Sequence, residues 1–156
     1  MATENFDPKR TLQLTRLIYF ALITGCLAYM VLIFYLAAGK IIFKPDMRDP
    51  LILSIVFLCC TTIPFGFFFS KKTCKKINSA ELLVKKYSIY QTGLIVKLAT
   101  CEGITLISAG LFLFTRNLFF VIFFLIALII MIMYYPTPDK IGKEINLTQS
   151  EIELFY

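Results

Sequence analysis

The chain has 156 residues, of which 58% are hydrophobic and 17% are charged, and its formal net charge is +6. Its mean hydropathy of +0.78 is far above that of a water-soluble domain, so the composition excludes an ordinary soluble fold. The chain has no histidine, and its 5 cysteines show no CxxC spacing. We therefore expect no metal, no other cofactor and no disulfide framework, and we interpret the cysteines as small apolar packing residues.

Four apolar blocks follow one another along the chain, at residues 17–38, 51–69, 93–114 and 118–135. Each is close to the roughly 20 residues that a helix needs to cross about 30 Å of hydrocarbon. The sequence therefore predicts an all-α fold: one integral membrane domain, residues 1–156, built as a bundle of four transmembrane helices. Only "TRN" separates the last two blocks, so we expect their helices to be antiparallel neighbours.

Lysine and arginine are distributed unevenly between the two sides of this predicted bundle. Eleven of them precede the first block, lie between the second and third, or follow the fourth, whereas four lie in the two opposite connections and Lys97 falls inside the third block. Because basic residues concentrate in cytoplasmic segments, we expect both termini, the basic segment 70–92 and the tail 136–156 to be cytoplasmic. We predict this N-in, C-in arrangement in the bacterial inner membrane.

The basic segment contains neither glycine nor proline between residues 70 and 92, which predicts that the second and third helices both extend beyond the membrane. Asn78 followed by Glu81 is typical of a helix N-cap, so we expect the third helix to begin near Ser79. Six lysines of this segment are expected to orient the chain and to attract anionic lipid headgroups or an acidic protein partner: Lys71, Lys72, Lys75, Lys76, Lys85 and Lys86. No recognised nucleic-acid-binding module accompanies them, so we expect no nucleic-acid partner.

The tail after the fourth block contains two further helix starts. Thr137 precedes Pro138, a favoured first helical residue, and Thr148 stands three residues before Glu151, the spacing of a capping box. We therefore predict two short interfacial helices at the C-terminus. They could lie on the membrane surface or against the basic segment, and the alternative is a tail that docks onto a protein partner.

One carboxylate, Glu102, lies inside the third apolar block, in the stretch "LATCEGITL". A charge at the membrane centre is unfavourable by roughly 2.5–3.5 kcal/mol, so we expect Glu102 to face other helices and to be protonated for much of the time. Counting from the cytoplasmic ends of the blocks predicts an intramembrane polar layer of Glu102, Thr24, Thr61, Thr62 and Pro64. Pro64 leaves the carbonyl oxygen of Cys60 without its helical donor, and a protonated Glu102 could supply that hydrogen bond.

Small residues are placed where two helices could approach closely. In the third block they are Ala99, Gly103 and Gly110, and in the first block they are Ala21, Gly25 and Ala28. Small residues spaced about one turn apart let two helix backbones come into contact in a membrane. We therefore predict that these two faces are sites of close helix packing.

Three roles for Glu102 stay open at this level. It could hold the bundle together through one hydrogen bond, bind a polar group on a partner subunit, or handle a proton or cation. Lys97 is poorly placed to pair with Glu102, because five residues turn a helix by about 500° and so separate the two side chains by about 140°. We expect Lys97 to reach the surface or another helix instead. With no second intramembrane carboxylate and no histidine, we expect no enzymatic acid–base pair.

The helix "LATCEGITLISAGLFLF", preceded by a basic loop and another apolar helix, resembles the hairpin of rotary ATPase proteolipid subunits. The resemblance covers residues 51–114 and implies that Glu102 occupies the position of the carboxylate that carries a proton or sodium ion. The helix "SIVFLCCTTIPFGFFF" departs from that family because it has Pro64 in place of repeated glycines. Over its whole length the chain resembles small, uncharacterised four-span proteins of bacterial inner membranes, which implies an architecture without a function.

The sequence therefore favours a small integral membrane protein that serves as a structural or accessory subunit of a membrane complex. Its expected partners are the lipid bilayer with its anionic headgroups, and either other membrane subunits or a second copy of the chain. The alternative is a proton-coupled transport or ion-conducting element that uses Glu102.

Overall fold

The computed structural model is all-helical over the residues that it describes, which are 7–37, 39, 41–46, 48–75, 77 and 82–156. Six helices follow in chain order: α1 (Pro8–Leu36), α2 (Pro50–Cys74), α3 (Leu83–Thr115), α4 (Phe119–Met133), α5 (Pro138–Ile145) and α6 (Gln149–Glu153). The predicted fold class is confirmed for this part of the chain.

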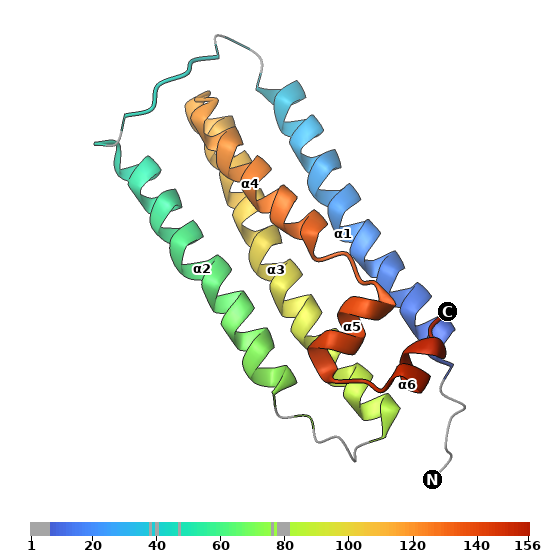
Figure 1. Ribbon diagram of the computed structural model, residues 1–156. Helices are drawn as coiled ribbons and strands as arrows, with labels where there is room; N and C mark the ends of the chain where they lie inside the picture. The colour runs from blue at the N-terminus through green and yellow to red at the C-terminus, as the bar shows by residue number, and fades with distance from the viewer. Residues whose placement is uncertain (1–6, 38, 40, 47, 76, 78–81) are drawn as a thin grey trace.

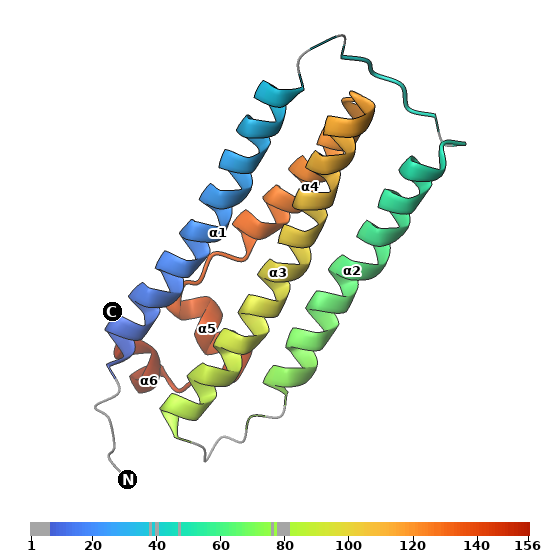
Figure 2. The ribbon, with the colours of Figure 1, turned by 180° about the vertical axis from the view of Figure 1, so that it is seen from behind.

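The longest helix, α3, is the centre of the structure. It contacts α1, α2, α4 and α5, and Figures 1 and 2 show it between α1 and α2, with α4 against one side. Its 33 residues correspond to a length of about 50 Å. The expected antiparallel pairing of the third and fourth helices is confirmed, because α4 returns along α3 directly after the turn.

Three helices are long and apolar enough to cross a membrane, namely α1, α2 and α3. Helix α4 has only 15 residues, or about 22 Å, and meets the same criteria only together with α5, which is bent from it by 85°. The described part of the chain thus has three candidate spans, or up to four. The predicted fourth block, 118–135, ends earlier as a helix because Pro136 disfavours helical backbone at the residue before it.

Helix starts follow the expected capping chemistry. Asp49 precedes Pro50 and accepts a hydrogen bond from the N–H of Leu51, and Thr137 does the same for the N–H of Lys140. Helices α2 and α3 both extend beyond their apolar blocks, as predicted, because α2 continues to Cys74 and α3 already begins at Leu83. The predicted cap at residues 78–81 lies outside the described residues, as does Lys76.

Two glycines bring α2 and α3 into close contact. A Cβ atom at Gly66 would collide with the side chain of Thr100, and one at Gly93 would lie 2.7 Å from Ser70 Oγ. Neither position has room for any side chain. The α2–α3 pair is therefore held at a distance that only glycine allows.

The C-terminal helices pack against the beginning of α3. Ile141 and Ile145 of α5 are fully buried, and the ring of Phe155 stacks on that of Tyr87 with a centroid distance of 5.6 Å. The tail was predicted to lie on the membrane surface, against the basic segment or on a protein partner, and the structure places it against the basic segment. Figure 1 shows α5, α6 and the Pro8 end of α1 at the same end of the bundle.

At the opposite end, the connection between α1 and α2 is attached to the turn between α3 and α4. Leu118 donates its N–H to the carbonyl of Ile42, and the N–H of Ile42 bonds the carbonyl of Arg116, both at 2.9 Å. The buried side chain of Asn117 accepts from the N–H of Lys44 at 3.1 Å and donates to its carbonyl at 2.8 Å. This end is thus joined by neutral amide groups.

Candidate functional site

The most unusual group inside the bundle is the ammonium of Lys97, which is only 5% exposed. Lys97 Nζ donates to both carboxylate oxygens of Glu144, at 2.8 and 3.0 Å, and lies 5.3 Å from the ring centre of Tyr134. Glu144 is on α5, so this pair joins the bent C-terminal helix to the middle of α3. A buried ammonium needs such a partner because its charge has been removed from water.

A pocket of about 360 Å³ opens beside this pair, between α2, α3 and α5. It is lined by Phe67, Lys71, Cys74, Lys75, Lys97, Lys143, Glu144 and Asn146. Four of these side chains are cationic and one is anionic, so the pocket has an excess of positive charge. Its local chemistry is suited to an anion rather than to a metal ion.

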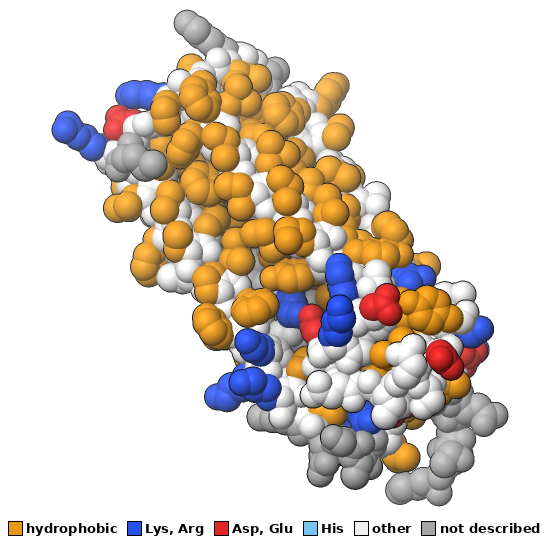
Figure 3. Space-filling view, viewed as in Figure 1, with side chains coloured by type: hydrophobic (Ala, Val, Ile, Leu, Met, Phe, Trp, Pro, Cys, Tyr) orange, Lys and Arg blue, Asp and Glu red, His pale blue; other side chains and the backbone are white. Residues whose placement is uncertain are grey.

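The pocket lies where the apolar surface of the bundle ends. Figure 3 shows apolar side chains over most of the length of this face, and Lys and Arg side chains gathered near α5 and the adjoining end of α2. From Lys97 to the end of α3 at Thr115 the helix rises about 27 Å, which matches the thickness of a hydrocarbon layer. The part of α3 that follows Lys97 is therefore long enough by itself to cross a hydrocarbon layer.

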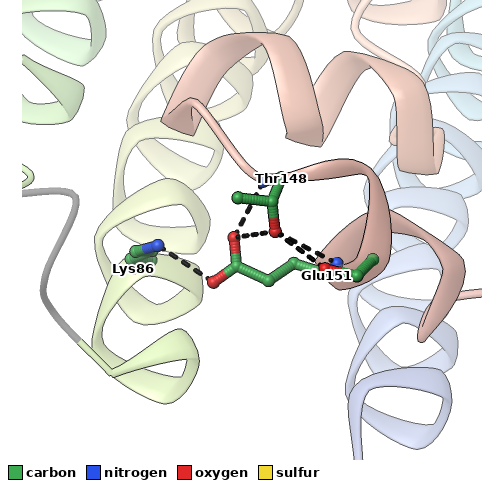
Figure 4. Close-up of polar contacts among 4 residues, drawn as sticks. Lys86, Thr148 and Glu151 are labelled. Carbon is green, nitrogen blue, oxygen red and sulfur yellow. Dashed lines mark hydrogen bonds and ion pairs between the residues drawn. The ribbon is translucent and has the colours of Figure 1, made fainter.

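A second ion pair fixes α6 to α3. Lys86 Nζ donates to Glu151 Oε1 at 3.0 Å, and the Lys86 side chain is only 4% exposed. The capping box predicted from Thr148 and Glu151 is confirmed and orients that carboxylate (Figure 4). The hydrogen bond from the Thr148 backbone N–H, together with the Lys86 ammonium, lowers the pKa of Glu151 from its ordinary value.

Glu102 lies on the side of α3 that faces away from α2. Thr100 faces α2 at Gly66, and two residues turn a helix by about 200°. The half-buried Glu102 side chain therefore lies on a different face of α3 from the contact with Gly66. Its carboxylate has no hydrogen bond or ion pair within the described part of the chain, so the bond considered above to the carbonyl of Cys60 is not formed there.

The other members of the predicted polar layer lie on separate faces. Thr24 and Pro64 are exposed on the outside of α1 and α2, and Thr61, also exposed, donates to the carbonyl of Phe57 on its own helix at 2.9 Å. Thr62 is half-buried between α2 and α3. The structure therefore does not bring the five residues together into one layer.

The predicted close-packing residues remain exposed or half-exposed, because no other described helix of the chain fully covers them. Ala21, Gly25, Ala28 and Ala99 are exposed, and Gly103 and Gly110 are half-buried. A Cβ atom added at Gly25, Gly103 or Gly110 would meet nothing within 4 Å. Ala99 and Gly103 also line an apolar groove of about 380 Å³ between α2 and α3, which has Leu58, Thr62, Val96, Thr100, Ile104 and Ile107 as its other walls.

The lysines of the basic segment differ in their surroundings. Lys71 and Lys75 line the pocket, and Lys72 is exposed on the same helix. Lys85 is exposed as well, whereas Lys86 is buried and bonded to Glu151. Only part of the group is therefore placed to reach lipid headgroups directly.

Two polar contacts between α1 and α3 were missed by the sequence reasoning. The thiol of Cys26 lies 3.2 Å from the hydroxyl of Thr105, and the hydroxyls of Thr15 and Tyr87 lie 2.8 Å apart. All four side chains are buried. The role of Glu144 as the partner of Lys97 was missed too. A lysine alone in an apolar block needs an acidic partner, and an acid on the amphipathic tail helix was available to supply it.

Comparison with protein-family models, with curated proteins and with solved structures finds no match to this chain. Within the described residues, no group of three or more cysteine, aspartate or glutamate side chains is arranged to hold a metal ion. The candidate site is therefore defined by its own geometry: the pocket beside Lys97, the groove beside Gly103, and the carboxylate of Glu102.

Proposed function

We propose that this integral membrane protein is a structural or accessory subunit that binds a transmembrane helix of another membrane protein. The observation that carries the proposal is that three glycines inside the spans, Gly25, Gly103 and Gly110, have open space where a side chain would be. Glycine inside a helix costs roughly 1 kcal/mol relative to alanine, and the chain's own packing does not require it at these positions.

The contrast with other glycines supports this reading. At Gly66 and Gly93 a Cβ atom would collide with α3 or α2, so those two are explained by the fold of the chain itself. The uncovered glycines are explained if a second backbone approaches them within the membrane, which is the usual role of small residues in membrane helices.

The groove between α2 and α3 is the contact surface that we assign to the partner helix. It has a volume of about 380 Å³, its surface is almost entirely apolar, and it is lined by the small residues Ala99 and Gly103. An incoming helix could place its own small residues against this surface, so that the two backbones come into contact.

We further propose that the end with α5 and α6 is cytoplasmic, in a bacterial inner membrane. Basic residues at that end include Lys71, Lys75, Lys140 and Lys143, whereas Lys44 and Arg48 at the other end are accompanied by Asp46 and Asp49. The positive-inside rule supports this orientation. The proposal assigns the chain no catalytic role.

Photo-cross-linking in native membranes tests the subunit proposal. A photoreactive amino acid at Ile107, which lines the groove, should give a product larger than the chain by the mass of one membrane protein. Gly103→Leu should abolish that product, because the leucine fills the groove while its own helix neighbours leave it space. Ile129→Phe, an enlargement at an exposed position of α4, is the matched control and should leave the product unchanged.

The proposal would be contradicted if the photoreactive residue at position 107 cross-linked only to lipid. It would also be contradicted if Gly103→Leu gave as much of the protein product as the unsubstituted chain. A product of twice the chain's mass would show that the groove binds a second copy instead. Purified yield and helicity of each variant report whether it has folded.

A second candidate function, proton or cation handling by Glu102, is favoured by one observation. The carboxylate makes no bond to another described residue, so it is not held in a fixed partnership. Glu102→Gln keeps a hydrogen-bonding group and removes the titration. If Glu102 handles protons, the unsubstituted protein should conduct protons in liposomes, and Glu102→Gln should lower this flux at least tenfold. Equal proton flux in the two proteins would exclude this function.

A further inference from the structure

The pocket beside Lys97 has more positive charge than its own residues neutralise. Its carboxylate, Glu144, is already bonded to Lys97 through both oxygens. Lys71, Lys75 and Lys143 make no ion pair within the part of the chain that the structure describes. The pocket therefore presents three ammonium groups to whatever enters it.

The buried pair makes this a built site rather than a loose group of surface lysines. Lys97 is fixed by two bonds to Glu144 and by the ring of Tyr134, and this fixed pair connects α3 to α5. Lys71 and Lys75 enter from α2, and Lys143 lies one residue before Glu144 on α5. The ammonium groups thus come from separate elements, and the ion pair fixes α5, which carries Lys143, against α3.

The pocket also has an apolar wall on the side toward the membrane. Phe67 is exposed on α2, one turn before Lys71, and the Lys71 ammonium lies 5.9 Å from the centre of its ring. Figure 3 shows the apolar side chains of this face beginning next to the Lys and Arg side chains. A molecule with a phosphate and an adjoining apolar part would satisfy the lysines and Phe67 together.

We propose that this pocket binds the phosphate of an anionic phospholipid headgroup, with the glycerol and upper acyl chain against Phe67. The three lysines that make no ion pair among the described residues, Lys71, Lys75 and Lys143, bring the phosphate oxygens several hydrogen-bond donors, beside the apolar ring of Phe67. Basic pockets between membrane helices recognise anionic headgroups in this way. A soluble phosphate ester has the same charged group but lacks the part that contacts Phe67.

The test uses the full-length chain, purified in mild detergent, with three probes. They are phosphatidylglycerol, phosphatidylcholine and soluble glycerol 3-phosphate, and binding is measured by native mass spectrometry and by the shift in melting temperature. We expect phosphatidylglycerol to bind, phosphatidylcholine to bind at least tenfold more weakly, and glycerol 3-phosphate to give no shift. Equal binding of the two lipids, or equal binding of glycerol 3-phosphate, overturns the proposal.

Substitutions locate the site. Replacing Lys71, Lys75 and Lys143 together by glutamine should weaken phosphatidylglycerol binding about a hundredfold, because each lysine near an anionic lipid contributes roughly fivefold. The matched control replaces three exposed basic residues of the same end, Lys9, Arg10 and Lys140, by glutamine and so makes the same change in net charge. Equal weakening in both triple variants would show a diffuse attraction and overturn the site.

A single substitution guards against a triple variant that fails to fold. Asn146 lines the pocket in a left-handed backbone conformation, with φ of 51°, which aspartate also tolerates. Asn146→Asp adds one negative charge with almost no change in shape. It should weaken phosphatidylglycerol binding about fivefold, and unchanged binding would contradict the proposal.

Discussion

The two ends of the bundle are held together by different chemistry. Beside α5 and α6, charged side chains join separate helices, Lys97 with Glu144 and Lys86 with Glu151. At the opposite end, Asn117 bonds both backbone groups of Lys44 through a neutral amide. Removing one member of a buried ion pair leaves a charge unsatisfied, whereas removing an amide leaves only polar backbone groups, so the two ends should respond very differently to substitution.

The largest effect is expected from Glu144→Ala at the charged end. This variant leaves the buried ammonium of Lys97 without its partner, and we expect the free energy of unfolding to fall by about 3 kcal/mol. Because the Glu144 side chain is 38% exposed in the pair, water screens part of the charge, and we therefore expect a loss at the lower end of the range for buried ion pairs. Chemical unfolding of the purified protein in detergent measures this difference.

The double variant Lys97→Met with Glu144→Leu separates the charge from the packing. Because both charges are removed together, we expect most of the lost stability to return. If the double variant is as unstable as Glu144→Ala, the loss does not come from an unpaired ammonium and the comparison between the two ends fails.

A smaller effect is expected from Asn117→Ala at the neutral end. It removes the two bonds to Lys44 and one to the N–H of Phe119, and we expect a loss of about 1–2 kcal/mol. Asn117→Asp keeps the acceptor oxygen for the two N–H groups, but it turns the donor toward the Lys44 carbonyl into a second acceptor and buries a charge, so it should be the more harmful change. An unfolding midpoint that is higher for Asp than for Ala would contradict this assignment.

Lowering the pH should loosen the attachment of α6 at the charged end. The pKa of Glu151 is lowered by the Thr148 N–H bond and by Lys86, so its contribution to stability is complete above its ordinary pKa of 4.5 and is lost as the pH falls through the lowered value. We expect the protection of the α6 amides, taken relative to the intrinsic exchange rate at each pH, to fall below about pH 4.5. Glu151→Gln should show the reduced protection at every pH, whereas the bonds of Asn117 should be unaffected by pH.

The smallest effect is expected from Lys44→Gln. Lys44 forms an exposed ion pair with Asp46, in which the two side chains are 72% and 41% exposed and the charged atoms are 3.7 Å apart. Such surface pairs contribute little, so unfolding should change by no more than about 0.5 kcal/mol. A larger loss would show that charge matters at this end as well.

The apolar blocks and the caps could be predicted from the sequence because they depend on neighbouring residues. The lengths of the first three apolar blocks predicted α1, α2 and α3. The capping box of Thr148 and Glu151 predicted the start of α6. The site could not be predicted in the same way. Lys97 and Glu144 are 47 residues apart, and only the bend after α4 brings α5 under α3.

The polar layer shows a second limit. Helices that are apolar on every side give no periodicity that identifies their inner face, so depth could be counted but direction could not. Thr24 and Thr61 were placed at a plausible depth, yet both are exposed on the outside of the bundle. For Glu102 the position of Thr100 against Gly66 was the missing information, and it comes only from the packing of α2 on α3.

The ion pair between α3 and α5 also bears on the order in which the protein is made. Lys97 leaves the ribosome well before Glu144, so α3 is inserted while its ammonium has no partner. Only after α4 has been made and α5 has folded against α3 can that charge be neutralised. A segment synthesised later thus completes a helix synthesised earlier, and the full stability of α3 depends on Glu144, which follows Lys97 by 47 positions.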